Sequence, residues 1–599
     1  MIVKKLNERT LAFYFDEIID EQLNEKIVWM KKQLELTSIE GIQSVQNTYH
    51  MMAVHFNPHL VDTSKIEAVV LKGLLGSPDS IYPSRTVEVP VCYDGPDLEK
   101  VAAAGKLSIS EVIQKHSEAL YHVYFLGFSA GFPYLGGLNS DLITPRLEQP
   151  RLRVESGSVG IADRQTGIYT VPSPGGWNLI GRTPFELFSP TQQPNCLIQA
   201  GDKLKFVPIS TEQYDQYKFC SKGEKTIHSD EKKQMQLKGI KILKAGILST
   251  IQDEGRYDGL SYGLSQSGVA DPFAYELALA LVGQNKPYPV LEVTMGGFEC
   301  QFEGETTFAI TGAESDVYLN DVKLKRWTTY KANSGDRLKI NSPSHGFRNY
   351  LAFGCKFHEQ YRFMNAYATD LKSKLGGMNG RKLMEGDCIY FTEKTEDNKS
   401  FMDNNQWRKG SISQSSLEKS HYFENLMRTT KSVRLHRGPQ YSRLSQLEWQ
   451  AFLETTYIVS PKSDRMGIRL EGSTFRPSEK MDILTDVIAF GAIQLTQDGT
   501  PIILMSERQT TGGYAKIANV AYDDLSILAQ AKPGDHIEFI EFTNVTENTN
   551  KSIYINNRND LKDLIIWEDM QDLSETIKIA LKYENSSAVY QVLVERRAD

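Results

Sequence analysis

A Gly-Asp pair followed by alternating apolar and polar residues occurs four times along the chain, and this pattern most constrains the fold. It occupies residues 201–206, 335–340, 386–391 and 534–539. Glycine adopts the backbone angles of a tight turn, and the aspartate side chain closes the turn by hydrogen bonding. The alternation that follows is typical of a half-buried strand. The pattern predicts related β-barrel modules in both halves of the chain. Unrelated Gly-Asp turns, which are common in β proteins, are the alternative.

The charge balance excludes several classes of function. The chain has 599 residues, enough for about four domains. It carries 67 Lys and Arg against 75 Asp and Glu, a net charge of −8, whereas a nucleic-acid-binding protein normally shows a basic face. With 40% hydrophobic and 24% charged residues, the chain is expected to fold. Its longest apolar runs, such as residues 488–493, are too short to cross a membrane. We expect neither a nucleic-acid nor a membrane partner.

The cysteines and the first residues indicate a cytoplasmic protein. Six cysteines lie far apart without a C-x-x-C pair, which is typical of reduced thiols rather than of disulfides or a zinc site. Residues 1–15 lack the apolar core of a signal peptide. His50, His55 and His59 do not have the spacing of zinc ligands, so no metal site is expected.

Residues 1–85 have the pattern of a small α/β domain. Residues 11–15 are strand-like, residues 21–36 have helical spacing, and residues 41–56 resemble a hairpin. Asp62 or Thr63 is expected to cap a second helix. The order strand, helix, two strands, helix predicts a ferredoxin-like domain.

The remaining chain divides by composition. Residues 86–220 are rich in Gly, Pro and aromatics, with strand-like runs at 121–126 and 203–207, and predict a β-barrel with long loops. Residues 221–237 are almost wholly polar and are read as a linker. Residues 238–543 form a second region of two β-barrel halves, which contains a polar stretch at 393–416. Residues 544–599 are a C-terminal extension, with a helix expected around 573–581 and a strand around 588–594.

Two segments of the first half are candidates for ligand binding. Residues 127–137 hold four glycines, which let backbone N–H groups approach a ligand. Residues 173–184 hold a Pro-Gly-Gly-Trp run and an arginine that suits a carboxylate. The alternative for Trp177 is that its side chain fills the barrel interior. The alternative for Arg146 is that it merely solvates a loop. The candidate residues are Gly127, Phe128, Gly131, Arg146, Gly175, Gly176, Trp177 and Arg182.

Three segments of the second half are further candidates. Arg256 is a candidate site residue, and a plain salt bridge with Asp253 is the alternative. Asp271-Pro272 is expected to begin a helix. Arg465 and Arg469 are spaced to reach one pocket, and pairing of one of them with Asp464 is the alternative. Residues 507–514 combine Arg, Gln, Thr, Gly and Tyr without apolar periodicity, which favours a polar ligand site over a core role. No P-loop, G-x-G-x-x-G motif or catalytic triad is evident.

The same segments carry a family resemblance. GFSAGFPYLGGL, VGIADRQTGIYTVPSPGGW and IGRTP resemble the allophanate-hydrolase-subunit-1 family, which includes the B subunit of 5-oxoprolinase. STIQDEGR, GVADPFAYELALALVGQ, SDRMGIRL and ERQTTGGYAKIANV resemble the allophanate-hydrolase-subunit-2 family, which includes the C subunit of 5-oxoprolinase and is also called the biotin-dependent carboxyltransferase family. The resemblance covers about residues 1–220 and 238–542. It implies a natural B–C fusion, mainly β with α+β, built of cyclophilin-like β-barrels and an N-terminal ferredoxin-like piece. Gly354-Cys355 and Thr485-Asp486-Val487 depart from the family pattern.

The resemblance implies a component of an ATP-dependent hydrolase that opens 5-oxoproline to L-glutamate. Its cofactor would be ATP with Mg²⁺, and its partner a protein like the A subunit of 5-oxoprolinase. The small-molecule site must hold the substrate carboxylate and stabilise an oxyanion with preorganised donors. Candidate catalytic residues are Arg465, Gln509 and Tyr514. Candidate substrate-binding residues of the second half are Arg256, Arg469, Gln494, Arg508, Thr510, Thr511, Gly512 and Gly513.

Two other functions remain open at this point. One is a carboxyltransferase of a urea-carboxylase-like system, which would need biotin on a partner protein because this chain has no Met-Lys-Met biotinyl site. The other is a non-enzymatic regulator of a histidine kinase. The fusion of both halves argues against the regulator, and a homo-oligomer is compatible with each function.

Overall fold

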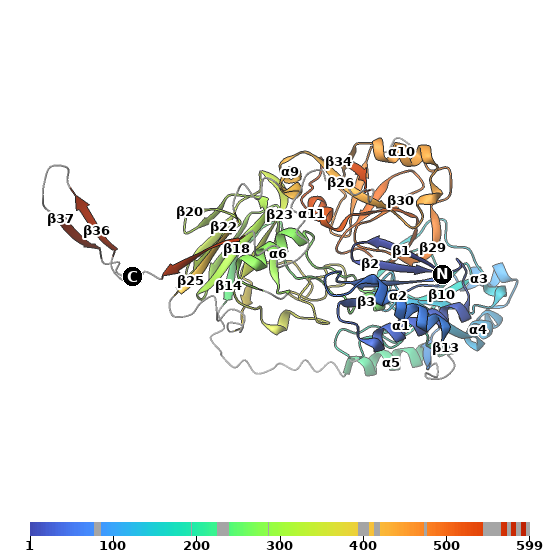
Figure 1. Cartoon of the computed structure of the whole chain (residues 1–599). Helices are drawn as coiled ribbons and strands as arrows, with labels where there is room; N and C mark the ends of the chain where they lie inside the picture. The colour runs from blue at the N-terminus through green and yellow to red at the C-terminus, as the bar shows by residue number, and fades with distance from the viewer. Residues whose placement is uncertain are drawn as a thin grey trace.

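The computed structural model describes residues 1–76, 85–192, 194–223, 239–284, 287–392, 406–412, 420–472, 476–542, 565–571, 577–582 and 589–594. Strands dominate these residues, and the expected mainly-β class with barrel sheets is confirmed. Figure 1 shows the chain running from the N-terminal half, in blue and cyan, through a green and yellow β body to an orange barrel. Within the described chain, no helix has the length and apolar character needed to cross a bilayer.

The N-terminal unit is a four-stranded antiparallel sheet in the order β1-β2-β4-β3, covered by two helices. The expected strand, helix, hairpin and helix are all present, and β1 precedes them as an edge strand; the ferredoxin-like assignment itself stays a prediction. Asp62 caps the second helix by accepting a hydrogen bond from Ser64 N. The elements are β1 (Ile2–Asn7), β2 (Thr10–Tyr14), α1 (Glu21–Thr37), β3 (Ile42–Asn47), β4 (Met51–Phe56) and α2 (Thr63–Leu75).

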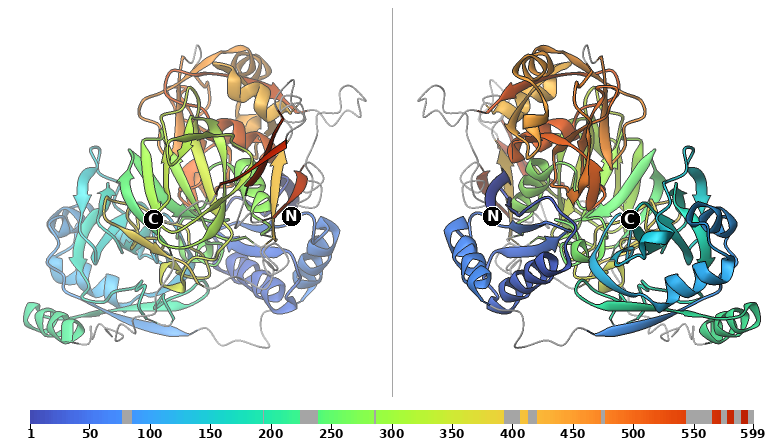
Figure 2. Two further views of the ribbon diagram at one scale, coloured as in Figure 1. Left: turned by 90° about the vertical axis from the view of Figure 1, so that its left-hand side faces the viewer. Right: turned by 90° about the vertical axis from the view of Figure 1, so that its right-hand side faces the viewer.

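Both faces of this sheet are buried. Ile27 and Met30 of α1 and Ile66 of α2 pack against one face. The other face packs against the second half of the chain, in a cluster that includes Val487 and Ala489. The N-terminal sheet is therefore an internal layer joining the two halves, as the side view in Figure 2 also shows.

The first barrel is a seven-stranded sheet whose edges meet. Its order is β12-β9-β10-β7-β6-β13-β5, and paired backbone hydrogen bonds between Cys92 and Arg182 join the two end strands. Strands β5 and β13 run parallel. The strands are β5 (Thr86–Val91), β6 (Leu120–Leu126), β7 (Pro133–Gly136), β9 (Ser158–Ala162), β10 (Gln165–Ile168), β12 (Asn178–Arg182) and β13 (Lys203–Pro208), with β8 (Arg151–Val154) and β11 (Ser173–Gly175) in a separate pair.

Helices α3 (Leu98–Gly105), α4 (Ile109–Glu118) and α5 (Thr211–Gly223) accompany the first barrel. Because α5 extends to Gly223, the first three residues of the expected linker are helical rather than unstructured. The rest of that linker, up to residue 237, lies outside the described residues.

The second half begins with two sheets that share one core. A six-stranded and a five-stranded sheet enclose apolar residues such as Ile242, Leu291 and Phe353. Helix α6 (Pro272–Leu281) packs on β18 and β23, and Asp271 caps it as expected. The strands are β14 (Gly239–Ala245), β15 (Leu248–Gln252), β16 (Val290–Thr294), β17 (Phe298–Phe302), β18 (Thr306–Glu314), β19 (Val317–Leu319), β20 (Val322–Leu324), β21 (Thr329–Ala332), β22 (Arg337–Ile340), β23 (His345–Phe353) and β24 (Cys388–Tyr390).

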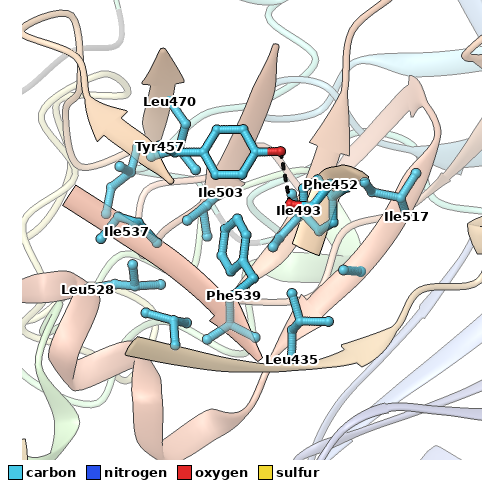
Figure 3. Packing of buried hydrophobic residues seen from close by; sticks show 14 of the residues in the cluster. Leu435, Phe452, Tyr457, Leu470, Ile493, Ile503, Ile517, Leu528, Ile537 and Phe539 are labelled. Atoms are coloured by element: carbon cyan, nitrogen blue, oxygen red, sulfur yellow. Dashed lines mark hydrogen bonds between the residues drawn. The ribbon is translucent and has the colours of Figure 1, made fainter. Parts of the chain in front are cut away.

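A closed barrel completes the second half. Strands β26 and β34 run parallel, as β5 and β13 do in the first barrel. Figure 3 shows its interior, where Tyr457, Ile503 and Phe539 pack together and the Tyr457 hydroxyl donates to the Phe452 carbonyl. Its elements are α9 (His421–Met427), β26 (Thr430–Arg437), α10 (Gln446–Glu454), β27 (Tyr457–Val459), β28 (Gly467–Glu471), β30 (Ala492–Leu495), β31 (Pro501–Leu504), β33 (Lys516–Val520), α11 (Leu525–Ala529) and β34 (His536–Glu541).

All four Gly-Asp patterns form the same turn. Gly201, Gly335, Gly386 and Gly534 have φ angles of +87°, +92°, +86° and +91°. In each turn the aspartate carboxylate accepts a hydrogen bond from the backbone N–H three residues earlier. The strands that follow are β13, β22, β24 and β34, so the turn-to-strand prediction is confirmed.

The C-terminal extension contributes strands. β35 (Ile565–Gln571) pairs with β25 (Gln406–Ile412), which lies within the polar stretch at 393–416, whose other residues are outside the described chain. The helix expected around 573–581 is wrong at residues 577–581, because β36 (Ile577–Lys582) pairs with β37 (Val589–Val594), and residues 573–576 lie outside the described chain. Ile577, Ile579 and Leu581 alternate with less apolar residues, which suits a strand better than a helix.

A buried histidine should make the stability of the first barrel depend on pH. His116 stacks on Phe206, and its ring nitrogens lie 2.8 Å from the Tyr93 hydroxyl and 3.0 Å from the Thr166 hydroxyl. Burial lowers the pKa of His116 from 6.5 to about 3. Below pH 6.5 the unfolded chain therefore binds a proton that the folded chain does not, so stability falls as the pH falls.

We expect His116 to account for about 2 kcal/mol of the unfolding free energy lost between pH 7 and pH 5. Urea unfolding of the wild type and His116→Gln at both pH values measures this. The variant should lose less stability over that interval, and an unchanged pH dependence would contradict the assignment.

Candidate functional site

The predicted segment at residues 507–514 lies where the two halves meet. β32 (Thr511–Tyr514) pairs with β29 (Asp482–Val487) as a two-stranded sheet. The register places Asp486 opposite Gly512 and Val487 opposite Thr511. Because Val487 packs into the N-terminal sheet, this pair brings the predicted segment against the first half.

A buried carboxylate and a buried ammonium lie at this position. Asp486 Oδ2 accepts hydrogen bonds from Gln440 Nε2 at 2.9 Å and from the Tyr14 hydroxyl at 3.3 Å. Lys516 Nζ lies 3.3 Å from the same oxygen, and both side chains are almost completely buried. Asp486 Oδ1 is buried without a hydrogen-bond partner among the described residues. The carboxylate therefore keeps one oxygen for another group.

Burial shifts the protonation of this cluster. It lowers the pKa of Lys516, although Asp486 opposes the shift. Burial, and then the charge of Asp486, raise the pKa of Tyr14 well above its ordinary value. Burial also lowers the pKa of His50, whose Nδ1 has no partner within the described chain. A lysine with a lowered pKa beside a carboxylate is a pair suited to proton transfer.

Two glutamine amides converge on Gly512. A methyl group at Gly512 would lie 2.9 Å from Gln494 Nε2 and 3.0 Å from Gln509 Nε2, so only glycine leaves both amides room. Gln494 Nε2 is buried and has no partner in the described part of the chain. The side-chain amides of Gln494 and Gln509 are fifteen residues apart in sequence. The structure brings both together as donors beside the backbone of Gly512.

The first half reaches the same sheet through its glycine-rich loop. Phe128 N donates to Thr511 Oγ1 at 3.2 Å, and a side chain at Gly127 would collide with that hydroxyl. Burial raises the pKa of Tyr134 to about 12, and the neighbouring Arg146, Thr511 and Thr485 oppose the shift. We call this meeting point, formed by the 127–134 loop and the β29–β32 pair, the seam site.

The other first-half candidates lie at different depths. Trp177 is buried with Phe132 in an aromatic cluster. Phe128 and Tyr134 pack against this cluster, so Trp177 supports the 127–134 loop. Gly175 lies against the Tyr169 hydroxyl in that cluster, and Gly176 faces residues 147–150. Gly131 donates its N–H to the Tyr262 carbonyl. Arg146 is exposed and pairs with Asp163, and Arg182 pairs with Asp94 and covers the Tyr214 ring.

The second-half arginines differ in their surroundings. Arg469 is exposed on β28, and Tyr514 is 46% exposed at the end of β32. Arg256 is buried and donates to the carbonyls of Phe363 and Ala368, so it stabilises the loop that contains these two residues. Thr510 Oγ1 is buried without a partner among the described residues, and Gly513 lies beside the Ile483 carbonyl.

Arg508 carries a buried charge without a carboxylate. Its Nε donates to the Ile488 carbonyl at 3.0 Å and its Nη2 to Gln266 Oε1 at 3.1 Å. Nη1 has no partner, and no acidic side chain pairs with Arg508 in the described residues. Burial lowers its pKa to about 10. An uncompensated buried guanidinium is costly, so the position favours an anion.

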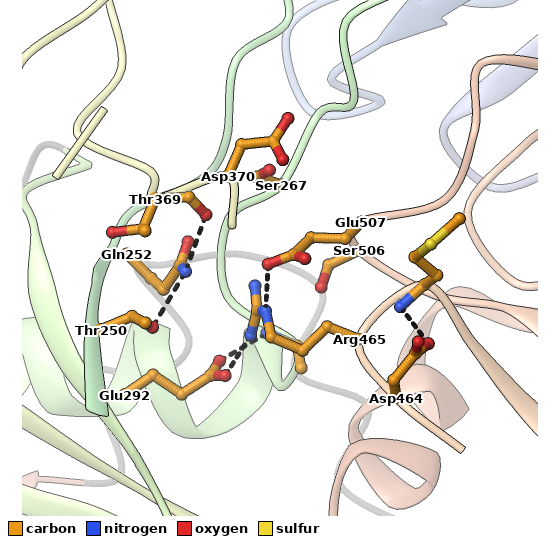
Figure 4. Close-up of polar contacts among 12 residues, drawn as sticks. Thr250, Gln252, Ser267, Glu292, Thr369, Asp370, Asp464, Arg465, Ser506 and Glu507 are labelled. Carbon is orange, nitrogen blue, oxygen red and sulfur yellow. Dashed lines mark hydrogen bonds and ion pairs between the residues drawn. The ribbon is translucent and has the colours of Figure 1, made fainter. Parts of the chain in front are cut away.

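Arg465 is held by two buried carboxylates. Figure 4 shows its guanidinium between Glu292 of β16 and Glu507, with Nε 2.7 Å from Glu507 Oε1 and Nη1 bonded to Glu292. Nη2 donates to the Gly268 carbonyl, so every guanidinium nitrogen is engaged. Arg465 therefore joins the first β body of the second half to the start of the 507–514 segment.

Unpartnered oxygens surround this ion-pair cluster. In the described chain, Asp370 Oδ2, Ser267 Oγ and Ser506 Oγ are buried without hydrogen-bond partners. Figure 4 shows all three near Glu507. Ser267 also has a φ of +53°, which a serine rarely adopts. The cluster therefore has spare hydrogen-bonding capacity beside Arg465.

Sequence reasoning missed the charged centre of the seam site. Tyr14, Gln440, Asp486 and Lys516 come from segments that are distant in sequence, and only folding brings them together. Lys516 could have been identified from the sequence as a candidate site residue, because it is a single lysine among apolar residues of a strand-like run. Asp486 stood out only as a departure from the family pattern.

Comparison with known proteins identifies the family. Profiles described as "Carboxyltransferase domain, subdomain C and D" and "Carboxyltransferase domain, subdomain A and B" match residues 1–198 and 262–541. The chain is 32% identical over 304 residues to the C subunit of 5-oxoprolinase from Escherichia coli (strain K12), covering 50% of this chain and 91% of that protein. The chain belongs to the biotin-dependent carboxyltransferase family.

A further relative matches the first half, and a solved structure matches most of the chain. The chain is 39% identical over 230 residues to the B subunit of 5-oxoprolinase from Bacillus subtilis (strain 168), covering 36% of this chain and 96% of that protein. The crystal structure of TTHA0988 in space group P6522 matches with a TM-score of 0.74 at 27% identity. It covers 89% of this chain and 100% of that chain, so both halves share its fold.

Removing the Arg465 charge should destabilise this carboxyltransferase fold strongly. Arg465→Met leaves Glu292 and Glu507 buried without their cation, and the expected cost is about 3–5 kcal/mol in unfolding free energy. The exposed Arg469→Met is the matched control and should change stability by less than about 0.5 kcal/mol. Chemical unfolding measures both. Wild-type stability of Arg465→Met would contradict the structural assignment.

Proposed function

We propose that the chain is a fused B–C component of an ATP-dependent 5-oxoprolinase that opens 5-oxoproline to L-glutamate together with a separate protein like the A subunit of that enzyme. The observation that carries this proposal is the seam site, where regions similar to the B and C subunits contribute adjoining residues. In a fused chain both contributions are held at equal concentration, so the site is assembled without a separate association step.

Opening a lactam sets three requirements for such a site. The substrate carboxylate must be held, negative charge on the amide carbonyl must be stabilised, and the leaving nitrogen must receive a proton. We assign the carboxylate to Arg508, whose buried Nη1 is unpartnered within the described chain. We assign the carbonyl to the amides of Gln494 and Gln509 beside Gly512.

The proton transfers are assigned to the buried pair. Asp486 Oδ1 accepts a proton from the attacking water as its oxygen bonds to the carbonyl carbon. As the carbon–nitrogen bond breaks, the Lys516 ammonium gives a proton to the leaving nitrogen, and its lowered pKa eases that transfer. Arg465 is a positioning residue in this scheme, because it holds Glu507 at the start of the 507–514 segment.

ATP with Mg²⁺ belongs to the assembled enzyme in this proposal. Among the described residues, the cluster with ligand-like spacing is Glu21, Glu25 and His122. The Lys203 ammonium already pairs with both glutamates, so this cluster does not suit Mg²⁺. We therefore derive no step through the nucleotide or the metal. The exposed Arg146 stays a candidate for substrate binding, and the half-exposed Tyr514 stays a candidate catalytic residue.

The test is glutamate release from 5-oxoproline with ATP and Mg²⁺, by the full chain with and without a separately expressed homologue of the A subunit. We expect glutamate only when both proteins are present. Lys516→Met and Asp486→Asn should lower the turnover number about 10²–10⁴-fold, the usual contribution of acid–base catalysis. Lys72→Met, on the exposed side of α2, should leave turnover unchanged.

The outcomes separate the function from the site. Wild-type turnover in both seam variants would discard the Asp486–Lys516 assignment while keeping the function. Absence of glutamate with both folded proteins present would overturn the function itself.

Carboxyl transfer is the second candidate, because both matching family profiles are described as carboxyltransferase subdomains. It requires a biotin carried by a partner protein. Transfer of labelled carboxylate from a carboxybiotinylated carrier to urea or a related amide, without glutamate formation, would favour this function over 5-oxoproline hydrolysis.

A further inference from the structure

Four oxygen-bearing side chains meet where the two β bodies of the second half join. Ser267 and Asp370 lie in the loops that follow β15 and β23, whereas Ser506 and Glu507 follow β31 of the closed barrel. Asp370, Ser267 and Ser506 are 0%, 2% and 1% exposed. In Figure 4, Asp370 and Ser267 lie across from Glu507 and Ser506. We call these four residues the junction site.

Three oxygens of the junction site keep free hydrogen-bonding capacity. Asp370 Oδ1 accepts hydrogen bonds from Lys372 N at 3.0 Å and Ser373 N at 2.9 Å, which orient the carboxylate. Asp370 Oδ2 and the hydroxyls of Ser267 and Ser506 have no partner within the described chain. A buried carboxylate oxygen without a donor is costly, and each hydroxyl still has lone pairs to offer. The three oxygens are therefore available to a ligand.

Glu507 adds a second carboxylate to the junction site. Its Oε1 accepts a hydrogen bond from Arg465 Nε at 2.7 Å. Burial raises the pKa of Glu507, and the charges of Asp370 and Glu292 add to the shift although Arg465 opposes it. Asp370 and Glu507 therefore repel each other across the site, and a positive charge between them would relieve that repulsion.

Carboxylates outnumber guanidinium groups around the junction site. Arg465 pairs with Glu507 and Glu292, and Arg348 also pairs with Glu292. Arg256 acts on its carboxylates at longer range, because its own hydrogen bonds go to backbone carbonyls. The buried carboxylates are Asp253, Glu292, Asp370 and Glu507, and the buried guanidinium groups are those of Arg256, Arg348 and Arg465. This balance favours a cation over an anion.

We propose that the junction site binds one hard metal cation through the carboxylates of Asp370 and Glu507 and the hydroxyls of Ser267 and Ser506. The available atoms are all oxygens, the ligands that hard cations prefer. Ca²⁺ suits such a set best, because it accepts about six to eight oxygens in a flexible geometry. The cluster of Glu21, Glu25 and His122 differs, because the Lys203 ammonium already neutralises its glutamates.

A cation at the junction site would be a second bridge between the two β bodies, beside Arg465. It would also act on the seam site. Asp370 and Leu375 exchange backbone hydrogen bonds of 2.8 and 3.1 Å, and Leu375 packs with Ala130 of the 127–134 loop. A cation that fixes Asp370 therefore stabilises the loop that contacts Thr511. By linkage, it favours the assembled seam site.

Calorimetric titration with calcium chloride tests the proposal on the full chain, after metal ions have been stripped with a chelator that is then removed. Thermal unfolding in sodium chloride against choline chloride, at equal ionic strength, tests a monovalent occupant. We expect saturable binding of one Ca²⁺ per chain. A rise in unfolding temperature with sodium alone would assign the same site to a monovalent cation.

Two variants and a control locate the binding. Asp370→Asn should weaken it tenfold or more, although the amide oxygen can keep both backbone hydrogen bonds. Ser267→Ala should also weaken it tenfold or more. This serine hydroxyl makes no hydrogen bond within the described residues, so a merely structural role predicts no change. Asp316→Asn, at an exposed aspartate of the same β body, should bind like the wild type.

Hydrogen exchange on the same samples tests the coupling. Peptides that cover residues 127–134 should exchange more slowly with the cation in the wild type, and this protection should disappear in Ser267→Ala. Absence of an effect of both cations, or wild-type affinity in both variants, would overturn the site. Binding without protection of residues 127–134 would overturn the coupling. These measurements need no turnover, so their failure leaves the proposed hydrolysis unaffected.

Discussion

The buried guanidinium of Arg465 connects parts of the second half that otherwise belong to different β bodies. Glu292 lies on β16, Glu507 precedes β32, and the arginine bonds to both. A cation shared by two buried carboxylates is costly to break, because either partner alone would be left charged in a low-dielectric interior. The start of the segment that reaches the seam is therefore fixed in position, and the geometry around Gly512 depends on this arrangement.

The second constraint is the N-terminal sheet, which packs on both faces. Its helices cover one face, and Val487 and Ala489 of the second half cover the other. Tyr14 projects from this sheet to Asp486, so the first half supplies a hydrogen-bond donor to a carboxylate of the second. The halves share a core and a polar centre, which gives a physical reason for their occurrence in one chain.

Local patterns predicted much of the fold. The Gly-Asp turns, the caps at Asp62 and Asp271 and the hairpin at 41–56 depend on neighbouring residues, and each is observed. The helix prediction failed at residues 577–581, whose alternation suits a strand and which lie in β36, paired with β37. At the site, the 507–514 segment and the glycine-rich segment 127–137 were predicted from the sequence, and their contact through Thr511 was not.

The sequence by itself determined the turns, the half-buried strands and the polar segments without a role in the core, because glycine conformation, side-chain capping and apolar period act over a few residues. The tertiary structure alone decided which of these segments meet. It paired Asp486 with Lys516 and Tyr14, left Arg508 without a carboxylate in the described chain, and enclosed Arg465 between two glutamates. Charge environment depends on burial and on partners far away in the chain, and neither quantity is local.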